Sequence, residues 1–272
     1  MSQQGTREMR FFILMTIACS LSITQVHASN STVDAIAKGT DIATEADRRF
    51  SGWKDLRANM KMTIQRSKSS VSQRQITIQS REVENEGDQT KIIFKSPRDI
   101  SGTAFLTYSK KTENDMQWLF LPAIKRIKRI SSQNISSPFV GSDFAFEDMS
   151  SQEIEKYTYK FTGNTPCGDD LECYIVERYP TNKNSGYSKQ VTLIDTAEYR
   201  IQSIKYYDKN NTLKKTLRNY DFFFHANHWR PFRNVMTNHI TGSETELSWS
   251  NFTFETGLGR GDFSKNSLKR SR

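Results

Sequence analysis

Short runs in which apolar and polar residues alternate, separated by turn residues, recur along most of this 272-residue chain. In the clearest run, residues 56–65, the apolar residues occupy every second position from Leu56 to Ile64. A period of two is typical of a β-strand with one buried face. Further strands are expected at 74–81, 92–94, 104–108, 118–121, 155–162, 171–179, 189–195, 199–207, 213–224, 232–240 and 244–255. About a dozen strands with short connections predict an antiparallel meander.

A helix is predicted before the first strand. The residues Ser31-Thr32-Val33-Asp34 resemble a capping box, which would begin the helix. Weakly apolar residues then recur at steps of three and four as far as Phe50, and Gly39 is expected to break or kink the helix. The pattern predicts an amphipathic helix that packs on the sheet. At the other end of the chain, the basic and polar tail 264–272 is expected to be frayed at its end.

The first 28 residues have the pattern of a secretory signal peptide. Arg7 and Arg10 supply positive charges, residues 11–24 are largely apolar, and Val26-His27-Ala28 fits a cleavage site. We therefore predict a signal peptide at 1–28, cleaved after Ala28, and a single exported domain at 29–272. Lipid attachment at Cys19 is the alternative, and Thr16 fits the lipoprotein pattern poorly.

Composition and charge narrow the choice of partners. The formal net charge is +9, which favours an acidic partner, and export argues against nucleic acid as that partner. Only 35% of the residues are hydrophobic, yet there are 17 Phe. Much of the apolar volume is therefore carried by a few large side chains, which suits a wide and incompletely filled interior.

Two cysteines remain after the predicted cleavage, Cys167 and Cys173. They flank the turn residues Gly168-Asp169-Asp170 between two strand patterns. In an oxidising compartment an even pair of this kind predicts a disulfide across a hairpin. A metal or redox pair is the minority interpretation, because the spacing is not C-x-x-C.

No pattern in the chain points to catalysis. The sequences G-x-S-x-G, H-E-x-x-H, G-x-x-x-x-G-K-[ST] and G-x-G-x-x-G are absent. His225 and His228 flank a predicted turn, where a surface position is favoured over a metal site. The carboxylates of Asp143, Glu147 and Asp148 could form an acid–base pair, but they have no nucleophile nearby in the sequence. We predict no enzyme activity, no cofactor and no metal.

Residues 91–150 contain the most distinctive motifs. Their order is F-x-S-P-x-D-I-x-G-T-A-F-L from Phe94, W-L-F-L-P-A-I-K-R-I-x-R-I from Trp118 and F-V-G-S-D-F-A-F-E-D-M from Phe139. Together these motifs resemble the LolA-like outer-membrane lipoprotein-sorting proteins, in the branch found beside RND/MMPL-type exporters. The resemblance extends from about Asp41 to Leu268.

The resemblance implies a mainly β fold, an incomplete and strongly curved antiparallel LolA/LolB-like β-barrel wrapped round an N-terminal helix. It implies a periplasmic carrier that binds lipid or lipoprotein acyl chains, touches membranes transiently and works with an RND/MMPL-type transporter. Residues 118–122 and 139–146 would then form the cavity wall and its lid. The apolar candidates for the cavity and lid are Met60, Met62, Phe94, Phe105, Trp118, Phe120, Leu121, Phe139, Phe144 and Phe146.

A cationic segment separates the two parts of this motif region. Its charges are Lys125, Arg126, Lys128 and Arg129, which we predict to dock an acidic partner or a lipid head group. A solvated strand is the alternative, although isoleucines at every third position, 124, 127 and 130, argue against a regular strand.

Two rival functions remain. One is a ligand-free accessory subunit of an exporter, and the other is a lipid hydrolase or isomerase, for which no catalytic pair is found.

Overall fold

A computed structural model describes residues 22–168 and 170–270, with side chains from Ser31 onwards. A long helix, α1 (Ser22–Phe50), precedes the strands, and a compact unit begins at Ala35 within it. The strands are β1 (Asp55–Ser67), β2 (Ser70–Arg81), β3 (Gln89–Ser96), β4 (Ala104–Tyr108), β5 (Met116–Leu121), β6 (Arg126–Ile130), β7 (Tyr157–Gly168), β8 (Leu171–Pro180), β9 (Lys189–Asp195), β10 (Ile201–Tyr207), β11 (Leu213–His225), β12 (His228–Asn238) and β13 (Glu244–Phe254). A short helix, α2 (Lys265–Lys269), follows, and 3₁₀ turns lie at 122–124, 132–134, 139–141, 146–149, 154–156 and 260–263.

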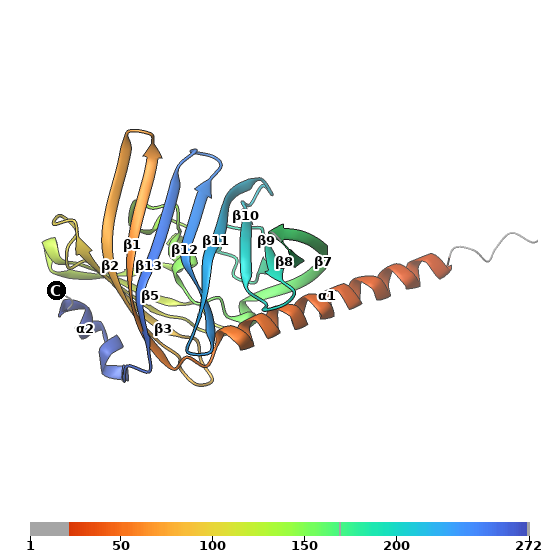
Figure 1. Cartoon of the computed structure of the whole chain (residues 1–272), viewed down its shortest axis with the longest axis horizontal. Helices are drawn as coiled ribbons and strands as arrows, with labels where there is room; N and C mark the ends of the chain where they lie inside the picture. Colours follow the sequence, from red (N-terminus) through yellow and green to blue (C-terminus); the bar gives the residue numbers. More distant parts are fainter. Residues whose placement is uncertain (1–21, 169, 271–272) are drawn as a thin grey trace, which may run out of the picture. The chain divides into compact units, whose positions relative to one another are not determined.

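The strands form one antiparallel sheet in the order β6-β5-β4-β3-β2-β1-β13-β12-β11-β10-β9-β8-β7. Two meanders, β1–β6 and β7–β13, are therefore joined through their first and last strands, and β1 and β13 lie side by side (Figure 1). The two edge strands, β6 and β7, do not pair with each other, so the sheet is open. The expected mainly β, incomplete antiparallel barrel is confirmed.

The two edges of the sheet nevertheless approach each other. The Asn182 side chain, after β8, donates a hydrogen bond to Asn114 beside β5, 3.0 Å from Nδ2 to Oδ1. Lys156, just before β7, forms an ion pair with Asp115. The sheet therefore curves far enough for its two edges to face each other. The gap between the edges, bridged by these side-chain contacts, is called the seam.

This topology determines what lies inside the curve. After β6 the chain must pass from one edge of the sheet to the other before β7 can begin. Residues 131–156, the crossover segment, make that connection, and their aromatic side chains pack against the central strands. Because the segment is not a strand, it covers the concave face without extending the sheet.

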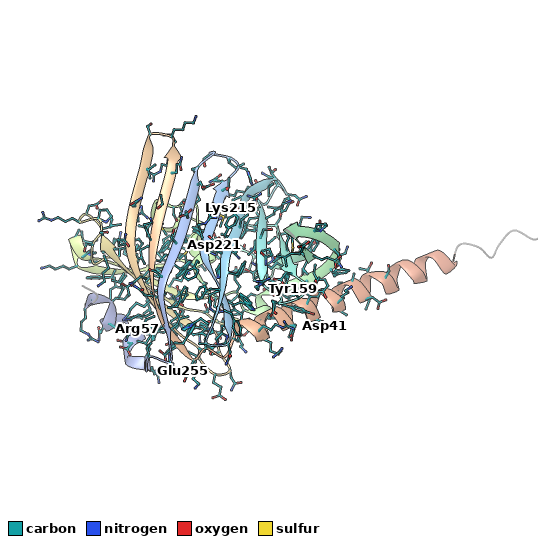
Figure 2. The ribbon with its side chains drawn as sticks, in the orientation of Figure 1. Asp41, Arg57, Tyr159, Lys215, Asp221 and Glu255 are labelled. Atoms are coloured by element: carbon teal, nitrogen blue, oxygen red, sulfur yellow. A yellow bond between two sulfur atoms is a disulfide. The ribbon has the colours of Figure 1, made fainter. Side chains whose placement is uncertain are left out.

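The C-terminal half of α1 also packs on the sheet. Ile42, Ala43 and Ala46 contact the side of β7–β9 that carries Tyr159 and Val176, and Tyr159 lies where α1 meets the strands (Figure 2). Ile194 of β9 and Ile204 of β10 face the same side, as the pairing of Ile204 with Thr192 requires. The concave face is therefore shared between α1 and the crossover segment. No helix in the described ranges is long and apolar enough to span a membrane.

The start of α1 differs from the prediction. The helix is continuous from Ser22, whereas the Ser31–Asp34 motif predicts a start at residue 31. No glycine or proline lies between residues 22 and 38, so nothing ends the helix there. Of the predicted signal peptide, residues 1–21 lie outside the described residues and Ser22–Ala28 belong to α1. The cleavage remains a prediction.

Gly39 neither breaks nor kinks α1, which runs through it. A Cβ at this position would lie 2.5 Å from the backbone nitrogen of Phe161, so the glycine permits close contact between helix and β7. We expect Gly39→Ala to destabilise the protein by about 1–3 kcal/mol, because overpacking outweighs the helix propensity of alanine. Chemical denaturation would measure the change, with the exposed Asp41→Ala as the control. An increase in stability would contradict this account of the packing.

The C-terminal tail covers the opposite face of the sheet and includes the short helix α2, while the predicted fraying at the end of the tail falls on residues 271–272, outside the described residues. Phe263 and Leu268 are fully buried against Trp118 and Phe120 of β5. Leu258, the 3₁₀ turn that carries Phe263 and the helix α2 that carries Leu268 together bring three apolar residues into one cluster on this face. The segment around β6 also differs from the prediction. It is a regular strand paired with β5, in which Arg126, Lys128 and Ile130 face one side.

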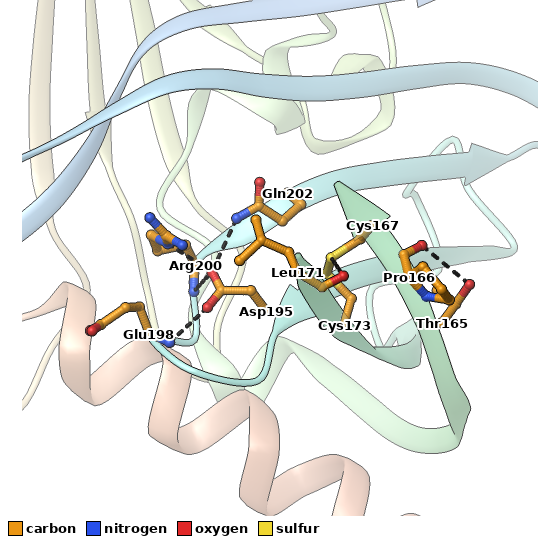
Figure 3. Close-up of a disulfide and its surroundings, with 9 residues drawn as sticks. All are labelled: Thr165, Pro166, Cys167, Leu171, Cys173, Asp195, Glu198, Arg200 and Gln202. Atoms are coloured by element: carbon orange, nitrogen blue, oxygen red, sulfur yellow. Dashed lines mark hydrogen bonds and ion pairs between the residues drawn. A yellow bond between two sulfur atoms is a disulfide. The ribbon is translucent and has the colours of Figure 1, made fainter. Parts of the chain in front are cut away.

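The predicted disulfide is confirmed. Cys167 and Cys173 are bonded across the β7–β8 hairpin, with 5.8 Å between their Cα atoms (Figure 3). Next to it, the Asp195 carboxylate accepts hydrogen bonds from the Arg200 and Gln202 side chains, which fixes the β9–β10 turn. The disulfide fits a protein that folds outside the cytoplasm.

Candidate functional site

The concave face of the central strands is apolar. Met60 and Met62 of β1, Phe94 of β3 and Phe105 of β4 are each at most 1% exposed and belong to one cluster. The strand register brings them together, because Met60 pairs with Ile76, Ile76 with Phe94, and Ile92 with Phe105. The alternation seen in the sequence thus predicts which residues share a face, and these four predicted residues do lie on one surface.

Three aromatic residues of the crossover segment cover this surface. Phe139, Phe144 and Phe146, which we call the aromatic plug, are 0%, 4% and 9% exposed. The Phe139 ring lies 5.1 Å from that of Phe105 and 6.0 Å from that of Phe94. Phe139 and Phe146 contact each other edge to face, 5.6 Å apart. Burial of each plug residue contributes about 1.5–3 kcal/mol. The predicted lid residues therefore lie on the predicted cavity wall.

Trp118 and Phe120 do not belong to this surface. They point to the other face of β5, where the C-terminal segment covers them, and the Trp118 ring packs 5.1 Å from Tyr108. Alternation along β5 requires this, because Leu119 faces the concave cluster. Leu121 is half-buried. The prediction that Trp118 and Phe120 line the same cavity as Phe105 is therefore wrong.

Polar contacts fix the crossover segment at Asp143. The Asp143 carboxylate accepts hydrogen bonds from Ser243 Oγ at 2.5 Å and Thr245 Oγ1 at 2.7 Å. The backbone carbonyl of Asp143 accepts one from Lys215 Nζ at 3.0 Å. These partners come from β11, β13 and the loop before β13, so the segment is attached across several strands. Asp143, Asp148, Lys215, Ser243 and Thr245 are called the polar latch below.

A buried ion pair is the second part of the polar latch. Lys215 Nζ lies 2.6 Å from Asp148 Oδ2, and both side chains are only 4% exposed. Lys215 is on β11 (Figure 2), and Asp148 is in the crossover segment. The Tyr187 hydroxyl donates to Asp148 at 2.9 Å, and burial together with the nearby Asp148 raises the Tyr187 pKa well above its usual value. Tyr187 therefore remains a hydrogen-bond donor over the ordinary pH range.

The end of the crossover segment is attached near the seam. Glu147 accepts hydrogen bonds from Ser185 Oγ at 2.7 Å and from the Gly186 backbone at 2.9 Å. Burial raises the pKa of the Glu147 carboxyl, and Asp148 raises it further. From β5, Gln117 Nε2 donates to the Phe146 carbonyl at 2.9 Å. The predicted carboxylates Asp143, Glu147 and Asp148 thus act as anchors of the segment.

The tip of the crossover segment adopts an unfavourable backbone conformation. Val140 has φ +47°, a left-handed conformation that β-branched residues rarely adopt. The following Gly141, at φ +74°, accepts a hydrogen bond from Arg66 Nη2 at 3.1 Å. Contacts to the sheet therefore hold the tip in place against the local preference of the chain.

The four predicted docking cations lie on an open edge of the sheet. Lys125, Arg126, Lys128 and Arg129 are all exposed on or beside β6. None of them forms an ion pair with another residue in the described part of the chain. Ile124 beside them is 51% exposed. The segment is thus a cationic edge strand with its outer side unpaired.

No arrangement typical of a metal site is found among residues 22–168 and 170–270, where no three His, Cys, Asp or Glu side chains are placed to hold an ion. His225 and His228 pair across the β11–β12 turn, as the turn prediction implies. The partners of the crossover segment on β11 and β13 were not predicted. Lys215 is a cation at a buried strand position, which is the one sequence signal that could have indicated them.

The family of this chain follows from comparison with known proteins. A family model, described as that of an uncharacterized protein, matches residues 86–270. A search of curated proteins gives no match. A crystal structure from Vibrio parahaemolyticus, described as an outer membrane lipoprotein-sorting protein domain, is 45% identical, with a TM-score of 0.84 over 86% of this chain and 100% of that one.

Two further crystal structures are similar. A DUF1329 family protein from Desulfovibrio piger is 27% identical, with a TM-score of 0.82 over 86% of this chain and 99% of that one. A LolA superfamily protein from Nitrosomonas europaea is 19% identical, with a TM-score of 0.70 over 84% and 98% of the two chains, and supports the fold alone. The chain therefore belongs to the DUF1329 family, is related to the lipoprotein-sorting protein domain from Vibrio parahaemolyticus, and has a LolA-like fold.

Proposed function

We propose that this protein is a periplasmic carrier that binds the acyl chains of a lipid or lipoprotein and passes them between membrane components. One observation carries the proposal. The apolar concave face of the open sheet is covered by the aromatic plug, which belongs to a connecting segment and not to the sheet. A connection can move away from a sheet without breaking strand pairs. The lipoprotein-sorting description of the 45% identical relative supports the same function.

The mechanism is an exchange of one apolar surface for another. When the aromatic plug leaves, acyl chains cover Met60, Met62, Phe94 and Phe105 in its place. Each Å² of apolar surface removed from water contributes about 25 cal/mol, whether phenyl rings or methylene groups cover it. The net cost of exchange is therefore far below the cost of exposing the face. The polar latch and the strained Val140 then determine how readily the segment opens.

The cationic edge strand is the proposed docking surface for a membrane partner. Lys125, Arg126, Lys128 and Arg129 are exposed and the outer edge of β6 is unpaired, so an acidic surface could approach it. The partner we propose is an inner-membrane transporter of the RND/MMPL type. Charge at this surface would mainly increase the rate of association.

A second candidate function is a ligand-free accessory subunit that docks an exporter. One observation favours it: Phe139 is 0% exposed, so the concave face is filled by the protein itself. In this alternative the aromatic plug is permanent core, and only the cationic edge strand acts. Neither proposal requires catalysis.

Native mass spectrometry of the protein, released from the periplasm without detergent, tests the proposal. We expect a one-to-one adduct of lipid mass, which is lost in Phe144→Asp and kept in the control Phe224→Asp, whose side chain is 57% exposed. Substitution of the four cations by serine should reduce capture of the transporter in both functions. A protein free of adduct after incubation with phospholipid vesicles and lipoprotein, yet still captured, would favour the accessory subunit.

A further inference from the structure

A cleft of about 540 Å³ lies in the seam between the two edges of the sheet. One wall is formed by residues 112–117 of the β4–β5 turn and β5, and the other by residues 180–185 after β8. The end of the crossover segment forms its floor through Glu147, Ser150 and Gln152. This seam cleft is separate from the concave core, and the two sites share the crossover segment.

The walls of the seam cleft are polar and nearly balanced in charge. Eleven of the nineteen residues that line it are Ser, Thr, Asn or Gln. The charged residues are three acids and two lysines. Two of them, Asp115 and Lys156, neutralise each other in an ion pair. Without an excess of cations the cleft is poorly suited to a phosphate group. Hydroxyl and amide groups suit a neutral ligand that forms several hydrogen bonds.

Gln117 gives a second, independent indication of a ligand. Its side chain is only 2% exposed, and its Nε2 donates to the Phe146 carbonyl and to Ser150 Oγ at 2.8 Å. Its Oε1 is also buried, and no donor within the described residues reaches it. A buried amide oxygen without a donor is unfavourable, and because Gln117 lines the cleft, a ligand hydroxyl bound there would be a suitable donor.

The remaining walls fit the same ligand class. Tyr157 lines the cleft and its hydroxyl is engaged with Gln152 at 2.7 Å, which fixes the position of the ring. A fixed aromatic ring can cover the C–H face of a sugar. Glu147, whose carboxyl pKa is raised by burial, lies beside Ser185 on the floor and is also next to Asp148 of the polar latch. A group bound here therefore touches residues that hold the crossover segment closed.

We propose that the seam cleft binds a neutral, hydroxyl-rich group, such as a hexose or a glycerol, as the head group of the carried lipid. The inference rests on the proposed carrier function, since the acyl chains of that lipid would occupy the concave face. The head group remains in the polar seam while the chains lie behind the crossover segment. The same hydroxyl chemistry could come from a free saccharide, so the experiment separates the two sources.

Two detergents with the same chain provide the test, n-octyl-β-D-glucoside and n-octylphosphocholine, each below its critical micelle concentration. By calorimetry we expect the wild-type protein to bind the glucoside at least tenfold more tightly. Thr181→Trp fills the cleft from an exposed loop. It should abolish the preference for the glucoside without lowering the affinity for n-octylphosphocholine. Ser132→Phe fills the cleft from the crossover segment. Lys205→Trp, on the exposed side of β10, is the control that keeps the preference.

Saturation-transfer NMR with free glucose separates the two sources. A signal from glucose alone that disappears in Thr181→Trp identifies a saccharide site, whereas discrimination between the detergents without a glucose signal identifies a lipid head group. Equal affinity for the two detergents with no glucose signal, or a preference that survives both cleft-filling variants, overturns the inference. If neither detergent binds but glucose does, the cleft is retained and the carrier function is rejected.

Discussion

Replacing Lys215 by methionine is expected to lower the free energy of unfolding by about 3–5 kcal/mol, because it leaves a carboxylate buried without its cation. The pair is short, 2.6 Å between Nζ and Oδ2, and both side chains are almost fully buried. In the variant, the donors to Asp148 that remain among the described residues would be the Tyr187 hydroxyl and the Ala145 backbone amide. The Asp143 carbonyl would lose a donor as well. Urea denaturation monitored by tryptophan fluorescence measures the loss.

Two further variants separate loss of the ion pair from loss of a long side chain. Lys205→Met, on the exposed side of the neighbouring strand β10, should change stability by less than about 0.5 kcal/mol. The double variant Lys215→Met with Asp148→Asn removes both charges and should recover much of the loss, since the uncompensated charge carries most of the cost. In Lys215→Met, the rate of hydrogen exchange should increase more in residues 139–148 than in β1. Equal losses in the single and double variants would show that the charge pair is not what holds the segment.

The strands were largely predictable from local pattern. β4, expected from its short apolar run, and β9 have the predicted bounds, and most other strands differ from the prediction by a few residues at their ends. The Cys167–Cys173 bond also followed from the turn residues between the two cysteines, together with the predicted export to an oxidising compartment. These features depend on contacts between residues close in sequence. β6 was missed as a regular strand because its isoleucine spacing reflects different partners on its two faces, Ile127 on one and Ile130 on the other.

The candidate site was predicted less completely, for a physical reason. Alternation shows that Phe94 and Ile93 face opposite sides, but both sides of β3–β5 are apolar and buried. Which side is concave depends on the curvature of the whole sheet and on where the crossover segment passes. Trp118 and Phe120 were therefore assigned to the wrong face. The polar latch joins residues up to 102 positions apart, such as Asp143 and Thr245, and no local pattern encodes such a pairing.

Phe139 and Phe105 provide the second prediction, in which one pair of matched variants separates a removable plug from permanent core. Both side chains are 0% exposed, and their rings touch each other at 5.1 Å. Phe139→Ala and Phe105→Ala should each cost about 3–5 kcal/mol of stability, since each leaves a cavity of similar size. On stability alone the two residues are therefore expected to be indistinguishable.

Binding of an acyl chain should distinguish them. In Phe139→Ala the competing side chain is lost while the concave wall is intact, so affinity for cis-parinaric acid, measured by its fluorescence, should rise about tenfold. That factor corresponds to about 1.4 kcal/mol, within the roughly 1.5–3 kcal/mol that burial of one phenyl ring contributes. Phe105→Ala removes part of the wall and should weaken binding. Equal weakening in both variants would mean that Phe139 belongs to the wall, and that acyl chains, if they bind, enter without displacing it.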